Sequence, residues 1–331
     1  MPTVFPPRLD VARLPTPTIA LERLSSAWGA GATIWIKRDD QTDAVLTGNK
    51  IRKLQYVVRE ALDQGCDTLV TCGGIQSNHC RATAALARQV GLEAVLVLRG
   101  QPSVPVGNHF LDLLFGAQIR WVDAETYRAH DRLMQQIAAE LRAAGRRPFV
   151  ISEGASMPMG CWGYVEAAAE IAETERQLGV RFDAIVHAVG SGGTSAGLEL
   201  GLRMHDVAAP LFGVPVCDDG AHFRELVARL CNETAQRFGI SVRVPADALR
   251  FIDGYVGDGY GRSRPEERRT ILEVARTEGL ALDPVYSGKA MHALRHELGS
   301  GCLAGARNVL FIHTGGVFGL FAHAADLVES S

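Results

Sequence analysis

The segment DAIVHAVGSGGTSAG, residues 183–197, decides the fold of this chain. Its first half is a short apolar run, typical of a strand covered on both faces, and its second half is a glycine-rich loop that leads into the helical pattern LELGLRMH. Glycines let successive backbone N–H groups converge on an anion at the start of a helix, and the hydroxyls of Ser191 and Thr194 add donors. The loop predicts a phosphate-binding turn; a tight turn with small residues for packing is the alternative.

Strand-like runs alternate with helical patterns on both sides of this segment. The amphipathic pattern of residues 51–62 ends at Gly65, and residues 124–144 and 163–178 have helical periods of the same kind. Alternation over nearly the whole chain predicts an α/β fold with mostly parallel sheets, covered by helices on both faces. The predicted strands are Thr33–Lys37, Thr68–Cys72, Ala94–Leu98, Gln118–Val122, Pro148–Ile151, Ala184–Val189, Leu211–Val216 and Val309–His313.

Length and composition exclude several classes of protein. The chain has 331 residues, 47% hydrophobic and 21% charged, and its formal net charge of −3 gives no case for a nucleic-acid or anionic-membrane partner. It has no apolar run of about eighteen residues, and its opening MPTVFPPRLD lacks the apolar core of a secretory signal. The seven cysteines form no CxxC pair, which argues against a zinc site. We expect a cytoplasmic protein without a bound metal, long enough for two domains that share a cleft.

A second glycine loop, CGGIQSNH at residues 72–79, also follows an apolar strand and precedes a helical pattern. Its backbone N–H groups suit a carboxylate, whereas Ser77 and Asn78 are also good helix caps, so the loop alone leaves both interpretations open.

A lysine stands in the first turn of another expected helix. In TGNKIRKL, residues 47–54, Lys50 lies where the helix macrodipole disfavours a cation. Such a lysine has either a solvated head or a bound anion nearby, and its position alone favours the solvated surface lysine. The positive charges of Arg52 and Lys53 would lower its pKa, which helps a lysine to act as a nucleophile.

Taken in order, these motifs resemble one known family. GNKIRKLQ, GGIQSNH, GSGGTSAG, DPVYSGKAM and IHTGG, together with LPTPTIALERLS and IKRDD near the start, cover essentially the whole chain. They resemble the D-cysteine desulfhydrase and 1-aminocyclopropane-1-carboxylate (ACC) deaminase family, within the fold-type II enzymes that use pyridoxal 5′-phosphate (PLP). The resemblance implies a two-domain α/β fold, with residues 1–54 plus 161–331 as the large PLP-binding domain and residues 55–160 as a small inserted α/β domain. It also implies a homodimer and a small amino-acid substrate.

The resemblance further implies a role for individual residues. Lys50 looks like the lysine that carries PLP as a Schiff base and moves the substrate proton. Ser77, Tyr260 and Tyr286 match the positions that face the substrate. The residues implied to hold the cofactor are Lys50, Asn49, Lys53, Asn78, Ser191, Gly192, Gly193 and Thr194, with either Ser287 or Thr314 at the pyridine nitrogen.

Two departures from the family pattern bear on the substrate. Ser287 stands where ACC deaminases have a glutamate, and a hydroxyl makes the ring a weaker electron sink than a carboxylate does. This favours β-elimination, most simply of D-cysteine to pyruvate, ammonia and hydrogen sulfide, or of a related compound such as cysteate, by a carbon–sulfur lyase. The alternatives are an ACC deaminase that forms 2-oxobutanoate and ammonia, and a catalytically silent PLP-binding protein. The second departure, residues 152–163, brings Glu153 and Trp162 either to the pocket or to the packing of the domain junction.

Overall fold

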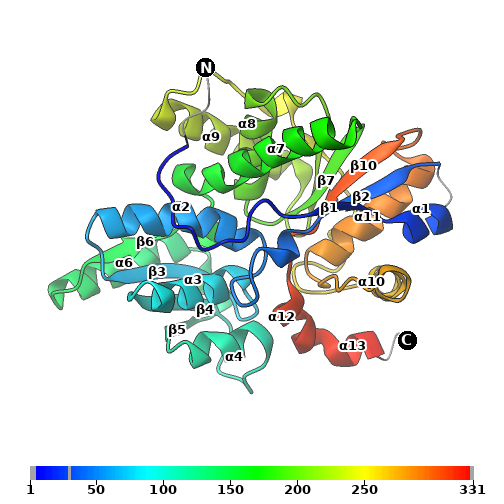
Figure 1. Ribbon diagram of the computed structural model, residues 1–331. Coiled ribbons are helices and arrows are strands. Elements are labelled where there is room, and N and C mark those ends of the chain that lie inside the picture. Colours follow the sequence, from blue (N-terminus) through cyan, green and yellow to red (C-terminus); the bar gives the residue numbers. More distant parts are fainter. Residues whose placement is uncertain (1–4, 29–30, 329–331) are drawn as a thin grey trace.

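The computed structural model describes residues 5–28 and 31–328, in which the strands form two separate sheets (Figure 1). In the larger sheet every neighbouring pair is parallel except β1 and β2, and the smaller sheet is entirely parallel. The larger sheet has the order β1 (Thr18–Ala20), β2 (Thr33–Lys37), β10 (Asn308–Ile312), β7 (Ala184–Val189), β8 (Leu211–Pro215) and β9 (Arg250–Phe251). The smaller sheet has the order β5 (Gln118–Val122), β4 (Glu93–Arg99), β3 (Thr68–Gly74) and β6 (Pro148–Val150).

Helices cover both faces of the larger sheet because its strands carry apolar side chains on both faces. Ile185 of β7 packs in the cluster formed with α7 (Pro158–Leu178) and α8 (Gly193–Met204), while its neighbour Val186 faces the cluster formed with the helices of the other side. Those other helices are α1 (Glu22–Trp28), α10 (Pro265–Glu278) and α11 (Ser287–Ser300), and α9 (Gly220–Phe238) packs on α8.

The smaller sheet is covered in the same way. Leu69 of β3 packs toward α2 (Asn49–Asp63) and α3 (Asn78–Gln89), and Val70 packs toward α6 (His130–Ala143). The remaining helical segments are η1 (Asp39–Gln41), α4 (Gly107–Leu114), α5 (Ala124–Tyr127), η2 (Glu153–Ala155), η3 (Ala246–Ala248), α12 (Val317–Leu320), η4 (Phe321–His323) and α13 (Ala324–Val328).

The expected α/β class with mostly parallel sheets is confirmed, and all eight predicted strands are present with ends shifted by at most two residues. The sequence did not predict β1 and β9, which are only three and two residues long. The helix predicted over residues 124–144 is wrong in one respect, because it divides into α5 and α6 around Arg128 and Ala129. The division into domains 1–54 plus 161–331 and 55–160 stays a prediction.

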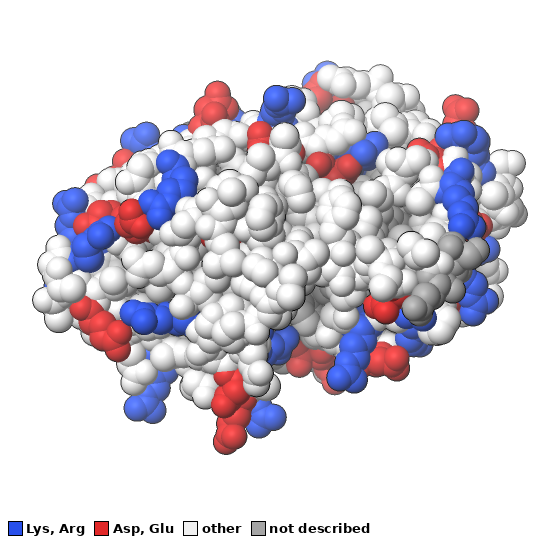
Figure 2. Space-filling view, turned by 90° about the horizontal axis from the view of Figure 1, so that it is seen from below, with Lys and Arg blue, Asp and Glu red and all other residues white. Residues whose placement is uncertain are grey.

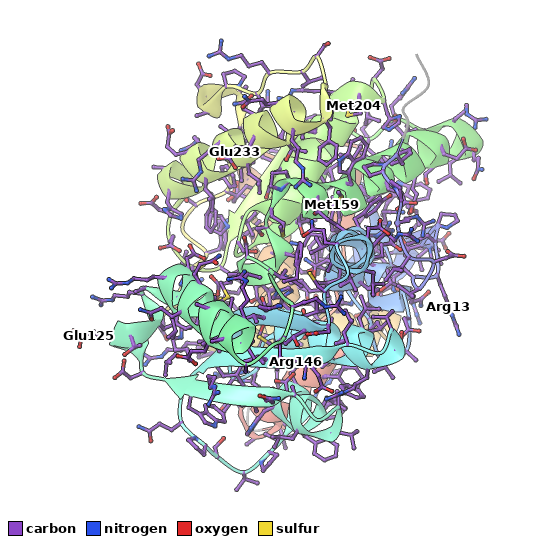
Figure 3. The ribbon with its side chains drawn as sticks, turned by 90° about the vertical axis from the view of Figure 1, so that its left-hand side faces the viewer. Arg13, Glu125, Arg146, Met159, Met204 and Glu233 are labelled. Carbon is purple, nitrogen blue, oxygen red and sulfur yellow. The ribbon has the colours of Figure 1, made fainter. Side chains whose placement is uncertain are left out.

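Close helix crossings connect the segment that bears Lys50 to the helices of the larger sheet. An added Cβ at Gly163 of α7 would overlap the carbonyl of Arg52 and lie 2.7 Å from the amide nitrogen of Lys53, both on α2. Figure 3 shows Met159, also on α7, among the packed side chains of this junction, whereas Glu125 points away from the protein. The glycine therefore allows the two helix backbones to touch directly beside Lys53.

Charged residues of both signs are interspersed on the face shown in Figure 2. Within the described part of the chain, none of the helices combines the length and the apolar character needed to cross a bilayer.

Candidate functional site

A cavity of about 200 Å³ lies where the loops after β3 and β7 meet the start of α2. The carboxyl ends of parallel strands and the adjacent helix N-termini are where α/β proteins bind ligands. The predicted site residues that line the cavity are Asn49, Lys50, Ser77, Asn78, Ser191, Gly192, Thr194, Tyr260, Tyr286 and Thr314. Three other predicted residues, Lys53, Gly193 and Ser287, are absent from its described lining.

The backbone before α2 directs Lys50 into this cavity. Gly48 has φ 101°, and a Cβ there would lie 2.8 Å from the carbonyl oxygen of Thr314, so the turn requires glycine. The amide of Asn49 donates to the same carbonyl at 3.0 Å. Burial lowers the pKa of Lys50 to about 8, while the negative charge of Glu153 partly opposes this shift. The predicted direction of the shift is confirmed, but its cause is burial rather than the charges of Arg52 and Lys53.

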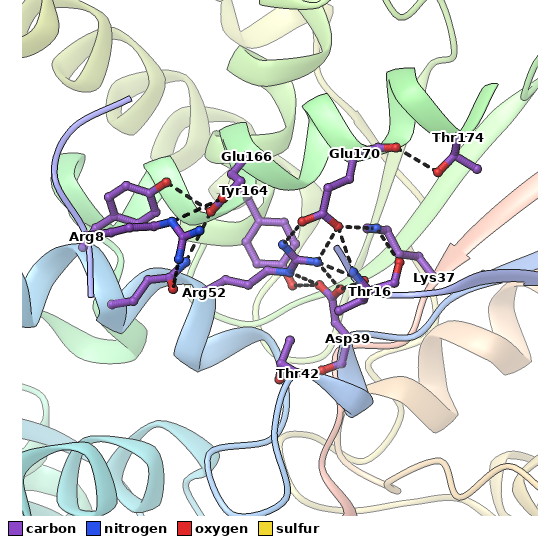
Figure 4. A network of polar contacts seen from close by, with 12 residues as sticks. Arg8, Thr16, Lys37, Asp39, Thr42, Arg52, Tyr164, Glu166, Glu170 and Thr174 are labelled. Atoms are coloured by element: carbon purple, nitrogen blue, oxygen red, sulfur yellow. Dashed lines mark hydrogen bonds and ion pairs between the residues drawn. The ribbon is translucent and has the colours of Figure 1, made fainter. Parts of the chain in front are cut away.

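Arg52 lies on the other side of α2, in a buried cluster of ionised groups (Figure 4). Its guanidinium binds Asp39 through Nε at 2.9 Å and Nη2 at 2.8 Å, and binds Glu170 through Nη1 at 2.8 Å. Lys37 Nζ donates to Glu170 at 2.6 Å, and Tyr164 donates to Asp39 at 2.6 Å. Two positive and two negative charges therefore balance, and they fix the first turns of α2 against η1 and α7.

The loop predicted to hold a phosphate forms the N-terminus of α8. Gly192 is the left-handed N-cap at φ 79°, the amide of Gly193 donates to Ser156 Oγ at 3.1 Å, and Ser156 Oγ donates to Ser191 Oγ at 2.8 Å. A Cβ at Gly193 would lie 3.0 Å from Lys53 Nζ, so this amine stands beside the loop. Free N–H groups at a helix start, hydroxyls and an ammonium form a suitable cradle for a phosphate.

Lys53 Nζ is fully buried and has no hydrogen-bond partner among the described residues. Burial and the nearby charge of Lys50 lower its pKa well below the usual value. A buried amine without a partner is costly, and an anion in the adjacent loop would supply the missing partner. The residues present therefore fit the phosphate of PLP.

Gly154 lies between the α8 loop and the amine of Lys50. A Cβ at this residue, where φ is 64°, would overlap the Ser191 hydroxyl and lie 3.2 Å from Lys50 Nζ. The amine of Lys50 therefore lies close to the α8 loop.

The second glycine loop forms the opposite wall. Ser77 is the N-cap of α3 and its hydroxyl accepts the amide of Cys80 at 3.2 Å, so the capping interpretation is correct. Ser77 and Asn78 also line the cavity, and the first N–H groups of α3 have no partners within the helix. The loop therefore caps the helix and lines the cavity, and its binding of a carboxylate stays a prediction.

Two tyrosines and a threonine are also part of the cavity lining. The hydroxyls of Tyr260 and Tyr286 are 2.5 Å apart, and the rings meet edge to face. Ser287 is turned away, because its hydroxyl donates to Asp283 Oδ1 at 2.6 Å and accepts from the Asp283 amide at 2.8 Å. Thr314 lines the cavity, so of the two groups expected near a pyridine nitrogen the geometry favours Thr314.

Arg99 and Tyr127 line the cavity but were not predicted as site residues. Arg99 lies over the rings of Tyr127 and Tyr260, at 5.3 and 5.6 Å from their centroids, and Tyr127 donates to Glu153 Oε1 at 2.6 Å. A charged residue at the end of an apolar strand was a usable signal for Arg99, whereas nothing in its helical pattern distinguishes Tyr127. The alternative that Glu153 lies at the pocket is correct, while Trp162 is buried in the core.

Comparisons with known proteins agree with this geometry. The model of the family "Pyridoxal-phosphate dependent enzyme" matches residues 9–315. The chain is 39% identical to a D-cysteine desulfhydrase of Klebsiella pneumoniae strain 342, over 97% of each protein. It is 40% identical to the mitochondrial bifunctional D-cysteine desulfhydrase/1-aminocyclopropane-1-carboxylate deaminase of Arabidopsis thaliana, over 88% of this chain and 74% of the other. A crystal structure of an ACC deaminase homologue superposes with a TM-score of 0.90 at 38% identity, covering 98% of this chain and 97% of that one.

Proposed function

Because the chain belongs to the pyridoxal-phosphate dependent enzymes, in the family of D-cysteine desulfhydrases and ACC deaminases, we propose that it is a lyase that acts on D-cysteine. Its cofactor is PLP. D-cysteine and water would give pyruvate, ammonia and hydrogen sulfide, and a related β-substituted amino acid such as cysteate would react in the same way. The observation that carries this proposal is the convergence of the Lys50 amine and the α8 loop on Gly154.

The residues of the cavity would divide the binding of the cofactor among them. The α8 loop, with Ser191 and Thr194, would hold the phosphate, and Lys53 would balance its charge. Lys50 would be the residue joined to the cofactor, and Asn78 would face the oxygen of its ring. When bound, the cofactor supplies an electron sink for the carbon that carries the substrate amine.

Lys50 would also move the substrate proton. A pKa of about 8 leaves part of the Lys50 amine neutral near neutral pH, and a neutral amine would accept a proton from Cα of the bound substrate. Ser77 and the first N–H groups of α3 would bind the substrate carboxylate and hold Cα beside Lys50. Tyr260 and Tyr286 would cover the substrate side chain and exclude water from it.

The surroundings of Ser287 support β-elimination over ring opening. Asp283 uses both carboxylate oxygens within its own turn, accepting from the amides of Val285, Tyr286 and Ser287. Position 287 therefore presents neither a carboxylate nor a free hydroxyl to the cavity, and the hydroxyl of Thr314 is a weak partner for a pyridine nitrogen. A weaker electron sink suffices when a good leaving group departs from Cβ, but suits the opening of an unactivated cyclopropane poorly.

A substrate panel on the PLP-loaded protein tests the proposal. D-cysteine, L-cysteine, ACC, cysteate, D-serine and β-chloro-D-alanine are compared by the release of pyruvate, 2-oxobutanoate and sulfide. We expect pyruvate and sulfide from D-cysteine at a rate well above that of 2-oxobutanoate from ACC. Comparable rates would favour the ACC deaminase, and a lack of pyruvate from β-chloro-D-alanine would leave only a catalytically silent PLP-binding protein.

Reduction with borohydride before peptide mapping identifies the lysine that is joined to the cofactor. We expect the label on Lys50, and its loss together with nearly all turnover in Lys50→Ala. Lys53→Ala is the matched control, one helical turn away, and we expect it to keep the covalent link while binding PLP more weakly. A label on Lys53 would show that our assignment is wrong. The homodimer and the cytoplasmic location stay predictions.

A further inference from the structure

A buried arginine is connected to the cavity wall through a chain of amide side chains. Arg81 of α3 is fully buried, and its Nε donates to Asn108 Oδ1 at 3.2 Å. Its Nη2 donates to the carbonyl of Thr47 at 2.9 Å and its Nη1 to that of Val45 at 2.5 Å. One side chain therefore contacts both α4 and the loop that leads to Lys50.

The chemistry of arginine fixes the orientation of the first amide. A guanidinium has only donors, so the atom of Asn108 that faces Arg81 must be its oxygen. The nitrogen then points the other way, where it donates to the backbone carbonyl of Gln76 at 2.9 Å and to Asn78 Oδ1 at 2.9 Å. A carbonyl can only accept, so this second contact independently requires the same orientation of Asn108.

The orientation of Asn78 follows from that of Asn108. Because Asn78 Oδ1 accepts from Asn108, the amide nitrogen of Asn78 is the atom left for the cavity that this residue lines. An N–H donor at that position favours the anionic form of an oxygen that faces it, whereas a carbonyl oxygen would disfavour it.

We propose that Arg81 and Asn108 are positioning residues, which hold the Asn78 amide so that it donates to the ring oxygen of PLP. This rests on the proposed placement of the cofactor. Neither residue lines the cavity within the described structure, so both act through Asn78. Arg81 also donates to the carbonyls of Val45 and Thr47, in the loop that precedes Lys50.

The variant Asn108→Asp separates this role from a purely structural one. Aspartate keeps the shape and gains an ion pair with Arg81, but it has no N–H group to donate to Asn78. Asn78 then has to turn its nitrogen toward residue 108 and its oxygen toward the cofactor. We expect the pH titration of the visible absorbance of the lysine-bound cofactor to move upward by at least one pH unit, a tenfold change in proton affinity.

Gln76→Met is the matched control. It removes the Gln76 side chain, which accepts the backbone N–H of Asn108 at 3.0 Å and donates to the Val106 carbonyl at 3.0 Å. It leaves the backbone carbonyl of Gln76, which orients the Asn108 side chain. We expect a lower melting temperature and an unchanged titration midpoint. A folded, PLP-loaded Asn108→Asp protein with the wild-type midpoint would overturn the proposal. A wild-type protein whose cofactor is not joined to Lys50 would instead contradict the proposed function.

A measurement on the unaltered protein is decisive if the variant does not fold. The chain has five asparagines, so labelling with ¹⁵N-asparagine gives five side-chain amide pairs for NMR. We expect PLP to shift the Asn78 pair strongly, because its N–H groups meet the ring oxygen, and to change the Asn108 pair little. An Asn78 pair that does not respond to PLP would overturn the proposal.

Discussion

Replacing Arg52 with methionine would leave a net negative charge in the buried cluster beneath α2. The side chains of Arg52 and Asp39 are fully buried, and the guanidinium makes five hydrogen bonds, two to Asp39, two to Glu170 and one to Thr16. Methionine fills a similar volume but restores none of them, and Lys37 then faces two carboxylates. Breaking a buried ion pair by removing one partner costs about 3–5 kcal/mol, and we expect a loss of that size in the free energy of unfolding.

The loss should depend on pH in a defined direction. Burial opposes ionisation of Asp39 and Glu170, but Arg52 and Lys37 outweigh it and hold both pKa values below the usual range. Without Arg52, burial would raise the pKa of Asp39 above its unfolded value. A carboxyl with a raised pKa stabilises the fold at low pH and loses that contribution as the pH rises. The difference between wild type and variant should therefore be larger at pH 8 than at pH 5.

Urea unfolding followed by circular dichroism, at pH 5 and pH 8, measures this difference. Arg59→Met is the matched control, since Arg59 lies on the same helix but forms an exposed pair with Asp63. Exposed pairs contribute about 0–1 kcal/mol, so this variant should unfold nearly as wild type does at either pH. A loss below about 1 kcal/mol in Arg52→Met, or an equal loss at the two pH values, would refute the reasoning.

Three further substitutions test the cavity. Ser77→Ala removes the α3 cap and should lower the free energy of unfolding by about 1 kcal/mol. If Ser77 also binds substrate, the same change should lower kcat/KM more than tenfold. A loss of stability with full activity would leave Ser77 as a cap only. Gly163→Ala should lower the free energy of unfolding by about 1–3 kcal/mol or more and weaken PLP binding, because the added methyl group meets the backbone of α2 beside Lys53. Melting curves and PLP titration measure the two effects, and wild-type values in both would contradict this prediction. Glu153→Gln removes a negative charge that raises the pKa of Lys50, so the acid limb of the kcat–pH profile should move to lower pH. An unchanged profile would exclude an electrostatic interaction between Glu153 and Lys50.

Much of the fold was predictable because its strands are apolar at successive positions and are separated by glycine-rich turns. The two unpredicted strands, β1 and β9, lie at the edges of the larger sheet and are too short to show a pattern. The break between α5 and α6 was missed because residues 124–144 contain no glycine or proline to mark it.

The candidate site was predictable where a residue's own loop places it and less so where distant segments decide. Ser191 follows a strand end at a helix start, so local sequence indicated it. The loop of Ser77 left a cap and a ligand-binding role equally open, and the position of Lys50 alone favoured a surface lysine, so for these two residues only the resemblance implied a role. The sequence could not show that Arg52 turns away toward Glu170, a residue 118 positions along the chain. Nor could the sequence show that the Ser287 hydroxyl donates to Asp283, because this hydrogen bond depends on the conformation of the turn between the two residues.

The glycine crossings of α2, α7 and α8 have a consequence for how this enzyme can change its substrate. Gly163 brings α7 against α2, and a Cβ at Gly201 of α8 would lie 2.6 Å from Ala168 Cβ of α7, so the three helices interlock backbone to backbone. Lys50 and the α8 loop consequently belong to one interlocked unit, in which a side chain added at either crossing glycine would collide with a neighbouring helix. Under the proposed function, substitutions around Ser77 and Arg99, which line the cavity from the smaller sheet, would change the selectivity for substrate without altering these crossings.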